Sequence, residues 1–165
     1  LSERFIEYYM EKYGFEIIDK KYYLEDHSIF YATRRNSRIK AIDLPHDYES
    51  NKALFKDYVQ HYYDEVGRIN SLIYKSIHPV YLFGAHIFSQ YLIAFGLETN
   101  KIITILDNST LKRGKRLYGT DFTVSSPDIL RNKGKASVIL KAGMYNKEIM
   151  EDIIANINPE VEFWL

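Results

Sequence analysis

The sequence has no cysteine, which excludes disulfide bonds, thiolate metal sites and cysteine nucleophiles. This absence is compatible with a reducing compartment, and we expect the protein to be cytoplasmic. Long apolar runs are also missing. None approaches the roughly 20 residues that a helix needs to cross a bilayer, so no membrane partner is expected.

An excess of charge of either sign is absent too, because 22 lysines and arginines balance 22 aspartates and glutamates. Nucleic-acid-binding proteins usually carry a basic surplus, so we expect no nucleic-acid partner. The histidines show neither i, i+4 pairing nor an H-E-x-x-H motif, and no metal site is predicted. The G-x-S-x-G nucleophile motif and the P-loop are missing as well.

What remains is the composition of a globular protein, with 46% hydrophobic and 27% charged residues in a chain of 165. This length fits one domain, or one small domain with an appendage. The 15 tyrosines are unusual, and they indicate either half-buried packing or stacking on a ligand. The chain begins at Leu1 and not at a methionine, and we expect it to be part of a longer protein.

Residues 1–35 predict a helix followed by strands at 15–19 and 28–33. The helix is indicated by apolar residues that recur every four positions, with Ser2 as its N-cap and Gly14 as the left-handed residue that ends it. A helix and a hairpin of this size cannot enclose a core. We therefore expect this segment to pack on another part of the protein.

A linker is predicted at 36–48, where a basic and then proline-bearing stretch shows no periodicity. A long helix is predicted at 49–75, because an apolar seam there steps by three and four residues. The seam consists of Phe55, Val59, Tyr62, Val66, Ile69 and Ile73. It fits either packing on the neighbouring domain, which we favour, or the interface of a homodimer.

From residue 79 onward, predicted strands alternate with short helices. Buried apolar runs predict strands at 80–83 and 102–106, and further strands are predicted at 136–140 and 161–164. Periodicity and capping residues predict helices at 87–95, 126–132 and 146–156. Strands joined through helices are parallel, with right-handed crossovers, in nearly all cases. Residues 49–165 are therefore predicted to form an α/β fold. It is a small Rossmann-like three-layer sandwich with a mainly parallel sheet, preceded by the long helix and by the N-terminal helix and hairpin.

Ligands of such a sheet bind outside the carboxyl ends of its strands. The turn after the first parallel strand contains Gly84, Ala85, His86 and Ser89, and the start of the next helix can hold a phosphate. Against the dinucleotide motif G-x-G-x-x-G only Gly84 matches, because His86 and Ser89 replace the later glycines. His86 would crowd a pyrophosphate, so NAD binding is disfavoured. We favour a structural or substrate-contact role for His86 over that of a general base oriented by Asp107.

The second strand is followed by Asp107 and Asn108. An acidic residue roughly 20 positions after the glycine turn either accepts a hydrogen bond from a ribose hydroxyl or forms an Asx turn. The loop at 109–119 carries four cations that either neutralise a diphosphate or are simply solvated. These cations are Lys112, Arg113, Lys115 and Arg116.

The third strand ends near Gly143, which permits close backbone approach, and Tyr145, which can stack on a base or a sugar. In a parallel sheet the strand tips at 84, 107 and 143 are expected to lie along one rim. The sequence therefore predicts a concave binding site for a phosphorylated ligand at that rim.

Five motifs follow the long helix in order: Tyr81-Leu82-Phe83-Gly84-Ala85, Asp107-Asn108, Lys112-Arg113-Gly114-Lys115, Gly119-Thr120 and Ser125-Ser126-Pro127. This order, over about residues 49–164, resembles the C-terminal domain of sugar C-methyltransferases. Those enzymes depend on S-adenosylmethionine (SAM) and act on nucleotide-linked deoxysugars. The stretches 13–19 and 28–33 look like the last helix and antiparallel strand pair of a class I SAM-dependent methyltransferase domain.

The resemblance implies that residues 1–35 are the tail of a truncated methyltransferase domain and that 49–165 form the substrate-side domain. Its implied partners are a nucleotide sugar and the missing SAM-binding domain, and the implied cleft wall consists of Gly84, Asp107, Lys112, Arg113, Gly119 and Thr120. The family's SAM-binding glycine-rich strand end, zinc-binding cysteines and acid–base residues are absent. The resemblance thus implies SAM in the parent enzyme but no cofactor and no catalytic residue in this fragment, which is expected to be inactive alone. The alternatives are a free-standing ligand-binding or dimerisation module and, disfavoured, an NAD-dependent oxidoreductase.

Overall fold

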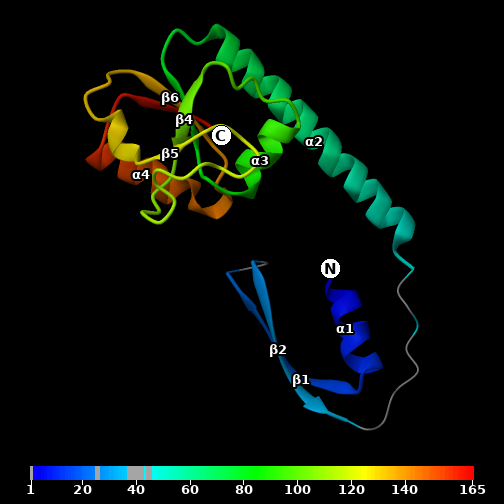
Figure 1. The fold of residues 1–165 in the computed structure, drawn as a ribbon. Coiled ribbons are helices and arrows are strands. Elements are labelled where there is room, and N and C mark those ends of the chain that lie inside the picture. The colour runs from blue at the N-terminus through cyan, green and yellow to red at the C-terminus, as the bar shows by residue number, and fades with distance from the viewer. Residues whose placement is uncertain (1, 25–26, 37–42, 44–45) are drawn as a thin grey trace. The chain divides into compact units, whose positions relative to one another are not determined.

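The computed structural model describes residues 2–24, 27–36, 43 and 46–165. The chain forms two compact units, Leu1–Ala53 and Leu54–Leu165 (Figure 1). Most of the predicted linker at 36–48 lies outside the described residues. Its last residue, Tyr48, is already the first residue of the long helix.

The first unit is a helix beside an antiparallel hairpin. Helix α1 spans Glu3–Lys12, strand β1 spans Phe15–Tyr23 and strand β2 spans Ser28–Arg35. Both strands run beyond their predicted ends, because their polar outer residues still pair across the hairpin. The Lys20 ammonium of β1 donates hydrogen bonds to the carboxylates of Glu3 and Glu7 and so ties the hairpin to the helix.

The ends of α1 confirm one prediction and correct another. Gly14 has a φ of +78°, as expected of the left-handed residue after a helix. Ser2 occupies the N-cap position, but its side chain makes no capping hydrogen bond. Its backbone carbonyl instead accepts hydrogen bonds from the N–H groups of Phe5 and Ile6, so the first turn is closed by the backbone.

The second unit confirms the predicted Rossmann-like α/β fold. Its helices are α2 Tyr48–Lys75 (of which the residues from Leu54 belong to this unit), α3 Ile87–Ala94 and α4 Asn146–Asn156, with one-turn 3₁₀ helices η1 Pro127–Leu130 and η2 Gly143–Tyr145. Its strands are β3 Val80–Phe83, β4 Ile102–Leu106, β5 Val124–Ser125, β6 Ala136–Leu140 and β7 Val161–Trp164. All four pairings are parallel, in the order β5-β4-β3-β6-β7.

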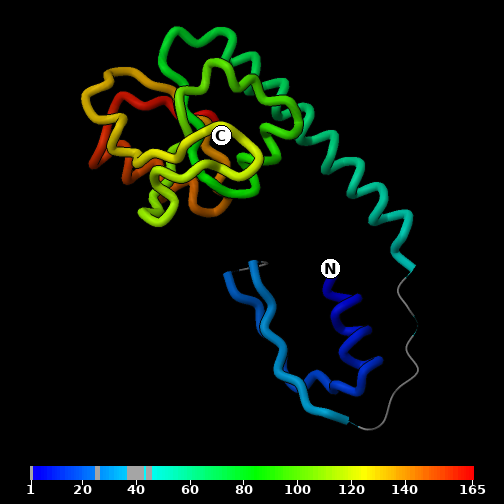
Figure 2. Tube along the Cα trace, in the orientation of Figure 1, coloured from blue at the N-terminus to red at the C-terminus, as the bar shows by residue number. Residues whose placement is uncertain are grey.

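This strand order is that of the doubly wound dinucleotide-binding fold, in which the chain works outward from a central strand and then crosses to its other side. Here it winds from β3 through α3 to β4 and β5, and then returns to place β6 on the opposite side of β3 (Figure 2). The reversal falls between β3 and β6. In open α/β sheets that point is where ligands bind, outside the carboxyl ends of the strands.

The sheet has a helical layer on each face (Figure 1). Alternate residues of β3 point to opposite sides, as the period of a strand requires. Val80 and Leu82 belong to one apolar cluster with residues of α2 and α3. Tyr81 and Phe83 belong to the other, with residues of α4 and η1. The predicted three-layer sandwich is therefore present.

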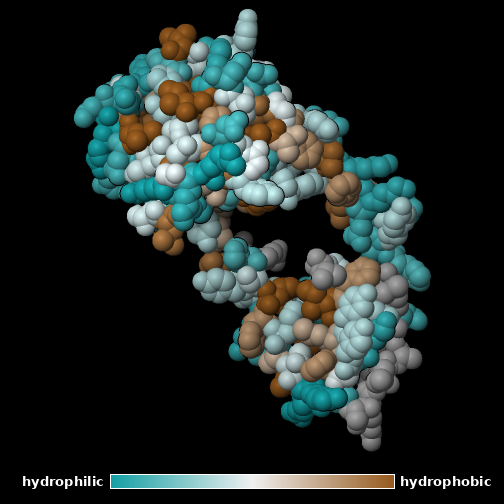
Figure 3. All heavy atoms as spheres, viewed as in Figure 1, coloured by the Kyte–Doolittle hydropathy of each residue, from teal (hydrophilic) through white to brown (hydrophobic). Residues whose placement is uncertain are grey.

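Only the C-terminal half of the predicted seam of α2 is buried in this unit. Val66, Ile69 and Ile73 are buried against the sheet, whereas 66% of Phe55 is exposed. Exposed apolar side chains also lie scattered among polar ones on the visible face of the second unit (Figure 3).

Two details differ from the prediction: one strand was missed and one helix is shorter. Strand β5 has two residues, too few for an alternating pattern to be recognised. The helix predicted at 126–132 is only the 3₁₀ turn η1, although Ser126 caps it as expected by accepting a hydrogen bond from the Asp128 N–H.

Candidate ligand-binding site

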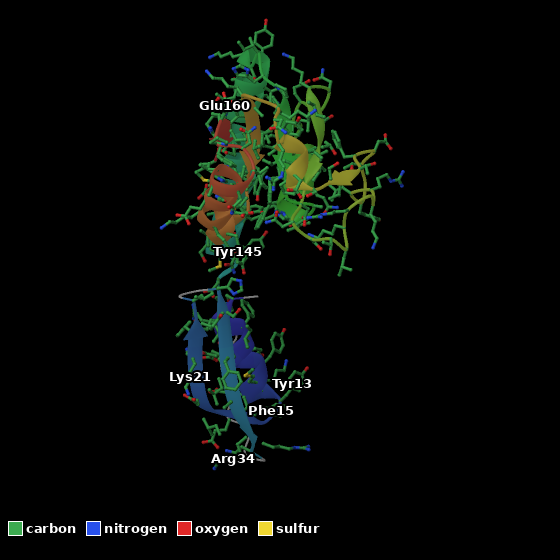
Figure 4. The ribbon with its side chains drawn as sticks, turned by 90° about the vertical axis from the view of Figure 1, so that its left-hand side faces the viewer. Tyr13, Phe15, Lys21, Arg34, Tyr145 and Glu160 are labelled. Atoms are coloured by element: carbon green, nitrogen blue, oxygen red, sulfur yellow. The ribbon has the colours of Figure 1, made fainter. Side chains whose placement is uncertain are left out.

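The carboxyl ends of the three central strands meet at one edge of the sheet. Phe83, the last residue of β3, pairs with Leu106 at the end of β4 and with Leu140 at the end of β6. The segments that follow these residues therefore begin side by side, as the sequence predicted. In Figure 4, Tyr145 lies at this end of the unit and Glu160 lies at the other, just before β7.

A cavity of about 400 Å³ lies at this edge. Its lining brings together many of the predicted site residues: Gly84, His86, Asp107, Asn108, Lys112 and Tyr145. The sequence did not single out Phe88 and Glu148, which also line it. Both lie in the first turns of helices that start at the rim, α3 and α4, and this position is the signal that could have identified them.

The Asp107 carboxylate connects the segments that follow β3 and β4 at the cavity. Its Oδ2 accepts hydrogen bonds from the Ala85 N–H at 2.8 Å and from the Lys112 ammonium at 2.9 Å, and its Oδ1 accepts one from the Ser109 N–H at 2.8 Å. Burial alone would raise the pKa of this carboxyl, but the bonds from Lys112, Ser109 and Ala85 outweigh it and lower the pKa. Asp107 is therefore an anion that is satisfied by protein donors. Of the two alternatives that the sequence left open for Asp107, the Asx turn is present.

His86 is the N-cap residue of α3. Its Nδ1 accepts a hydrogen bond from the Phe88 N–H at 3.3 Å, so the ring proton of the neutral imidazole is on Nε2. Burial and the charge of Lys112 lower the pKa of His86 more than the charge of Asp107 raises it. Because the Nδ1 lone pair is already used by the Phe88 N–H, the neutral ring has only its Nε2–H to offer, which suits contact with a ligand better than proton abstraction.

The remaining residues of the turn after β3 shape its backbone. Gly84 has a φ of +102°, a conformation that favours glycine. The Ser89 hydroxyl is fully buried and donates to the carbonyl of Gly84 at 2.5 Å. Ser89 therefore stabilises the turn, and its buried hydroxyl is not accessible to a ligand. Ala85 donates its backbone N–H to Asp107.

Other predicted site residues lie elsewhere. Gly143 lines a separate cavity of about 200 Å³ together with residues of α2, including Glu65. Hydrogen bonds from Arg68 and Lys141 outweigh burial there and lower the pKa of Glu65 to about 2. Gly119 and Thr120 line a third cavity, of about 310 Å³.

The cationic loop is more ordered than its composition suggested. Its backbone folds back in an antiparallel arrangement, with the Gly114 N–H donating to the Val124 carbonyl and the Val124 N–H donating to the Lys115 carbonyl. Of its four cations, Lys112 lines the 400 Å³ cavity. The other three, Arg113, Lys115 and Arg116, are exposed.

Comparisons with protein-family models, with curated proteins and with solved structures each found no match. Within residues 2–24, 27–36, 43 and 46–165, no group of three histidine, aspartate or glutamate side chains is arranged to hold a metal ion. No helix in the described part of the chain is long and apolar enough to cross a bilayer.

Proposed function

We propose that residues 49–165 are the substrate-side domain of a SAM-dependent methyltransferase that acts on a nucleotide-linked sugar, and that this chain is inactive alone. The observation that carries the proposal is the 400 Å³ cavity at the carboxyl ends of β3, β4 and β6. It lies at the topological reversal of a Rossmann-like sheet, where small molecules bind in such folds.

The chemistry of the lining supports a sugar nucleotide. Lys112 uses one N–H on Asp107, and an ammonium group has two more to offer to the hydroxyl groups of a sugar. Tyr145 is half-exposed at the rim, where an aromatic ring can stack on a base or on the apolar face of a sugar. Asn108 adds an amide that both donates and accepts.

The first unit supports the methyltransferase half of the proposal. Its hairpin leaves large apolar side chains exposed, among them Ile18 at 52% and Phe30 at 61%. A helix and a hairpin of this size do not form a domain core by themselves. In the proposal they are the end of a SAM-binding domain, which would also supply SAM and the catalytic residues.

A calorimetric screen of this chain against dTDP-, GDP- and CDP-sugars and SAM tests the proposal. We expect weak binding of a sugar nucleotide and no binding of SAM. Lys112→Ala should weaken the binding at least fivefold, whereas Lys115→Ala, a cation of the same loop that is exposed outside the cavity, should not. Binding of SAM, or sugar-nucleotide binding that both variants leave unchanged, would contradict the proposal.

The exposed first half of the α2 seam favours a second candidate, a free-standing module that dimerises through this helix. Phe55 of the seam is 66% exposed, and the neighbouring Leu54 is 65% exposed. Heptad-like seams commonly pair with a second helix. Sedimentation equilibrium distinguishes the two candidates. A mass that stays monomeric at all concentrations would exclude the dimer.

A further inference from the structure

The imidazole of His86 lies directly over Gly84. A Cβ placed on Gly84 would lie 2.1 Å from Nε2, 2.6 Å from Cδ2 and 2.8 Å from Cε1 of that ring. The ring thus occupies the space above the turn between β3 and α3. In dinucleotide-binding folds this space is where a glycine lets the diphosphate approach the backbone.

Two contacts with Phe88 hold the ring in that position. Its Nδ1 accepts the Phe88 N–H, and it packs edge-on against the Phe88 ring, with centroids 5.6 Å apart and an interplanar angle of 84°. The same hydrogen bond occupies one of the N–H groups at the start of α3, from which a bound phosphate would otherwise accept a hydrogen bond. His86 therefore blocks the turn both by its volume and by occupying a donor.

The charges in the cavity wall do not favour a diphosphate either. The Lys112 ammonium is paired with the Asp107 carboxylate at 2.9 Å, so the two charges largely cancel. Glu148 adds a further carboxylate to the wall. Together with the Nε2–H of His86, the Asn108 amide and the Tyr145 ring, this lining offers donors, acceptors and an apolar surface without a net positive charge. Hydroxyl groups on a carbon ring match it better than phosphate does.

We propose that His86 is a specificity-determining residue that closes the Gly84 turn to a diphosphate, so that the cavity takes the neutral sugar portion of the ligand. This inference rests on the proposed function for the identity of the sugar ligand, but the blocking of the turn does not depend on it. The diphosphate of a nucleotide sugar then lies outside the turn.

His86→Ser tests the volume of the ring, because serine can still cap α3 with its oxygen and keep a first-turn N–H occupied, whereas the ring is removed. The probe is inorganic pyrophosphate, measured by calorimetry. We expect His86→Ser to bind pyrophosphate at least tenfold more tightly than the wild type. His78→Ser, at the amino end of β3 and so at the opposite edge of the sheet, should behave like the wild type. Equal affinity of the wild type and His86→Ser for pyrophosphate would overturn the inference.

His86→Asn, which also caps helices well, replaces the serine variant if thermal unfolding shows that the latter does not fold. The outcomes separate this inference from the proposed function. Gain of pyrophosphate binding without any sugar-nucleotide binding by the wild type supports the role of His86 and refutes the sugar-nucleotide ligand. Sugar-nucleotide binding by the wild type with no gain of pyrophosphate binding refutes the role of His86 alone.

Discussion

The Asp107 carboxylate, just after β4, accepts a hydrogen bond of 2.8 Å from the backbone N–H of Ala85, in the turn after β3. This contact joins two strand ends that are distant in the sequence, and it does so at the edge where the cavity lies. Asp107 therefore positions the site whether or not it touches a ligand.

Asp107→Asn should lower the free energy of unfolding. The amide keeps one acceptor oxygen for three donors, and its NH₂ group is unsuited to the Lys112 ammonium, so we expect a loss of about 1–3 kcal/mol. Urea unfolding measures it. Asp121→Asn is the control, because the Asp121 side chain is fully exposed and 3.9 Å from its nearest cation. A cost for Asp107→Asn no larger than that of the control would show that the three bonds contribute little.

Gly84→Ala combines two penalties that a double-mutant cycle can separate. The positive φ of Gly84 costs an alanine about 1–2 kcal/mol, and the collision with His86 adds to this. In a His86→Ser background the collision is gone, so we expect the cost of Gly84→Ala to fall by at least 1 kcal/mol, within the range seen for residues in contact.

Gly96→Ala is the matched control for that cycle. Gly96 has a φ of +97°, similar to that of Gly84, and a Cβ there would meet no atom within 4 Å. Its substitution should cost the same with or without His86. If His86→Ser leaves the cost of Gly84→Ala unchanged, the ring does not occupy the space above the turn in solution.

The two halves of α2 should respond differently to truncation. Ile69 is fully buried against the sheet, and Ile69→Ala should destabilise the protein by about 2–5 kcal/mol. Phe55 lies on the same seam but is 66% exposed. Phe55→Ala should therefore lower the free energy of unfolding by less than about 0.5 kcal/mol. Thermal unfolding monitored by circular dichroism gives both values. A large cost for Phe55→Ala would mean that the first half of the seam is also packed, by dimerisation for example.

The stability of the fold should depend on pH through His86. Because burial and Lys112 lower its folded pKa, the unfolded chain takes up a proton first as the pH falls. The stabilising contribution of the neutral ring is thus complete above the unfolded value of about 6.5 and declines below it. The difference in melting temperature between the wild type and His86→Ser should shrink between pH 7.5 and pH 5. A difference that stays constant over this range would show that His86 does not titrate differently on folding.

Local patterns were enough to derive the elements and the class of the fold. The segments 80–83, 102–106 and 136–140 are bounded on both sides by glycine, proline or charged residues. Strands β3, β4, β6 and β7 were all predicted where the structure has them. Parallel pairing followed from the alternation of strands with helices, and with it the meeting of the strand ends at one edge. The strands and helices depend on residues that are close together in the chain, so hydrophobic periodicity and capping residues predict them directly.

The membership of the site was decided by the tertiary structure. Gly119 and Thr120 line a different cavity from the one that Gly84 lines. Phe88 and Glu148, which the sequence did not single out, line the same cavity as Gly84. The sequence predicted that His86 would crowd this turn, but only the structure gave the position of its ring over Gly84 and the three donors around Asp107. Each depends on the path of a loop and the rotamer of a side chain. Loop paths and side-chain rotamers are determined by contacts between segments that are distant in the sequence, so the residue pattern of one segment does not predict them.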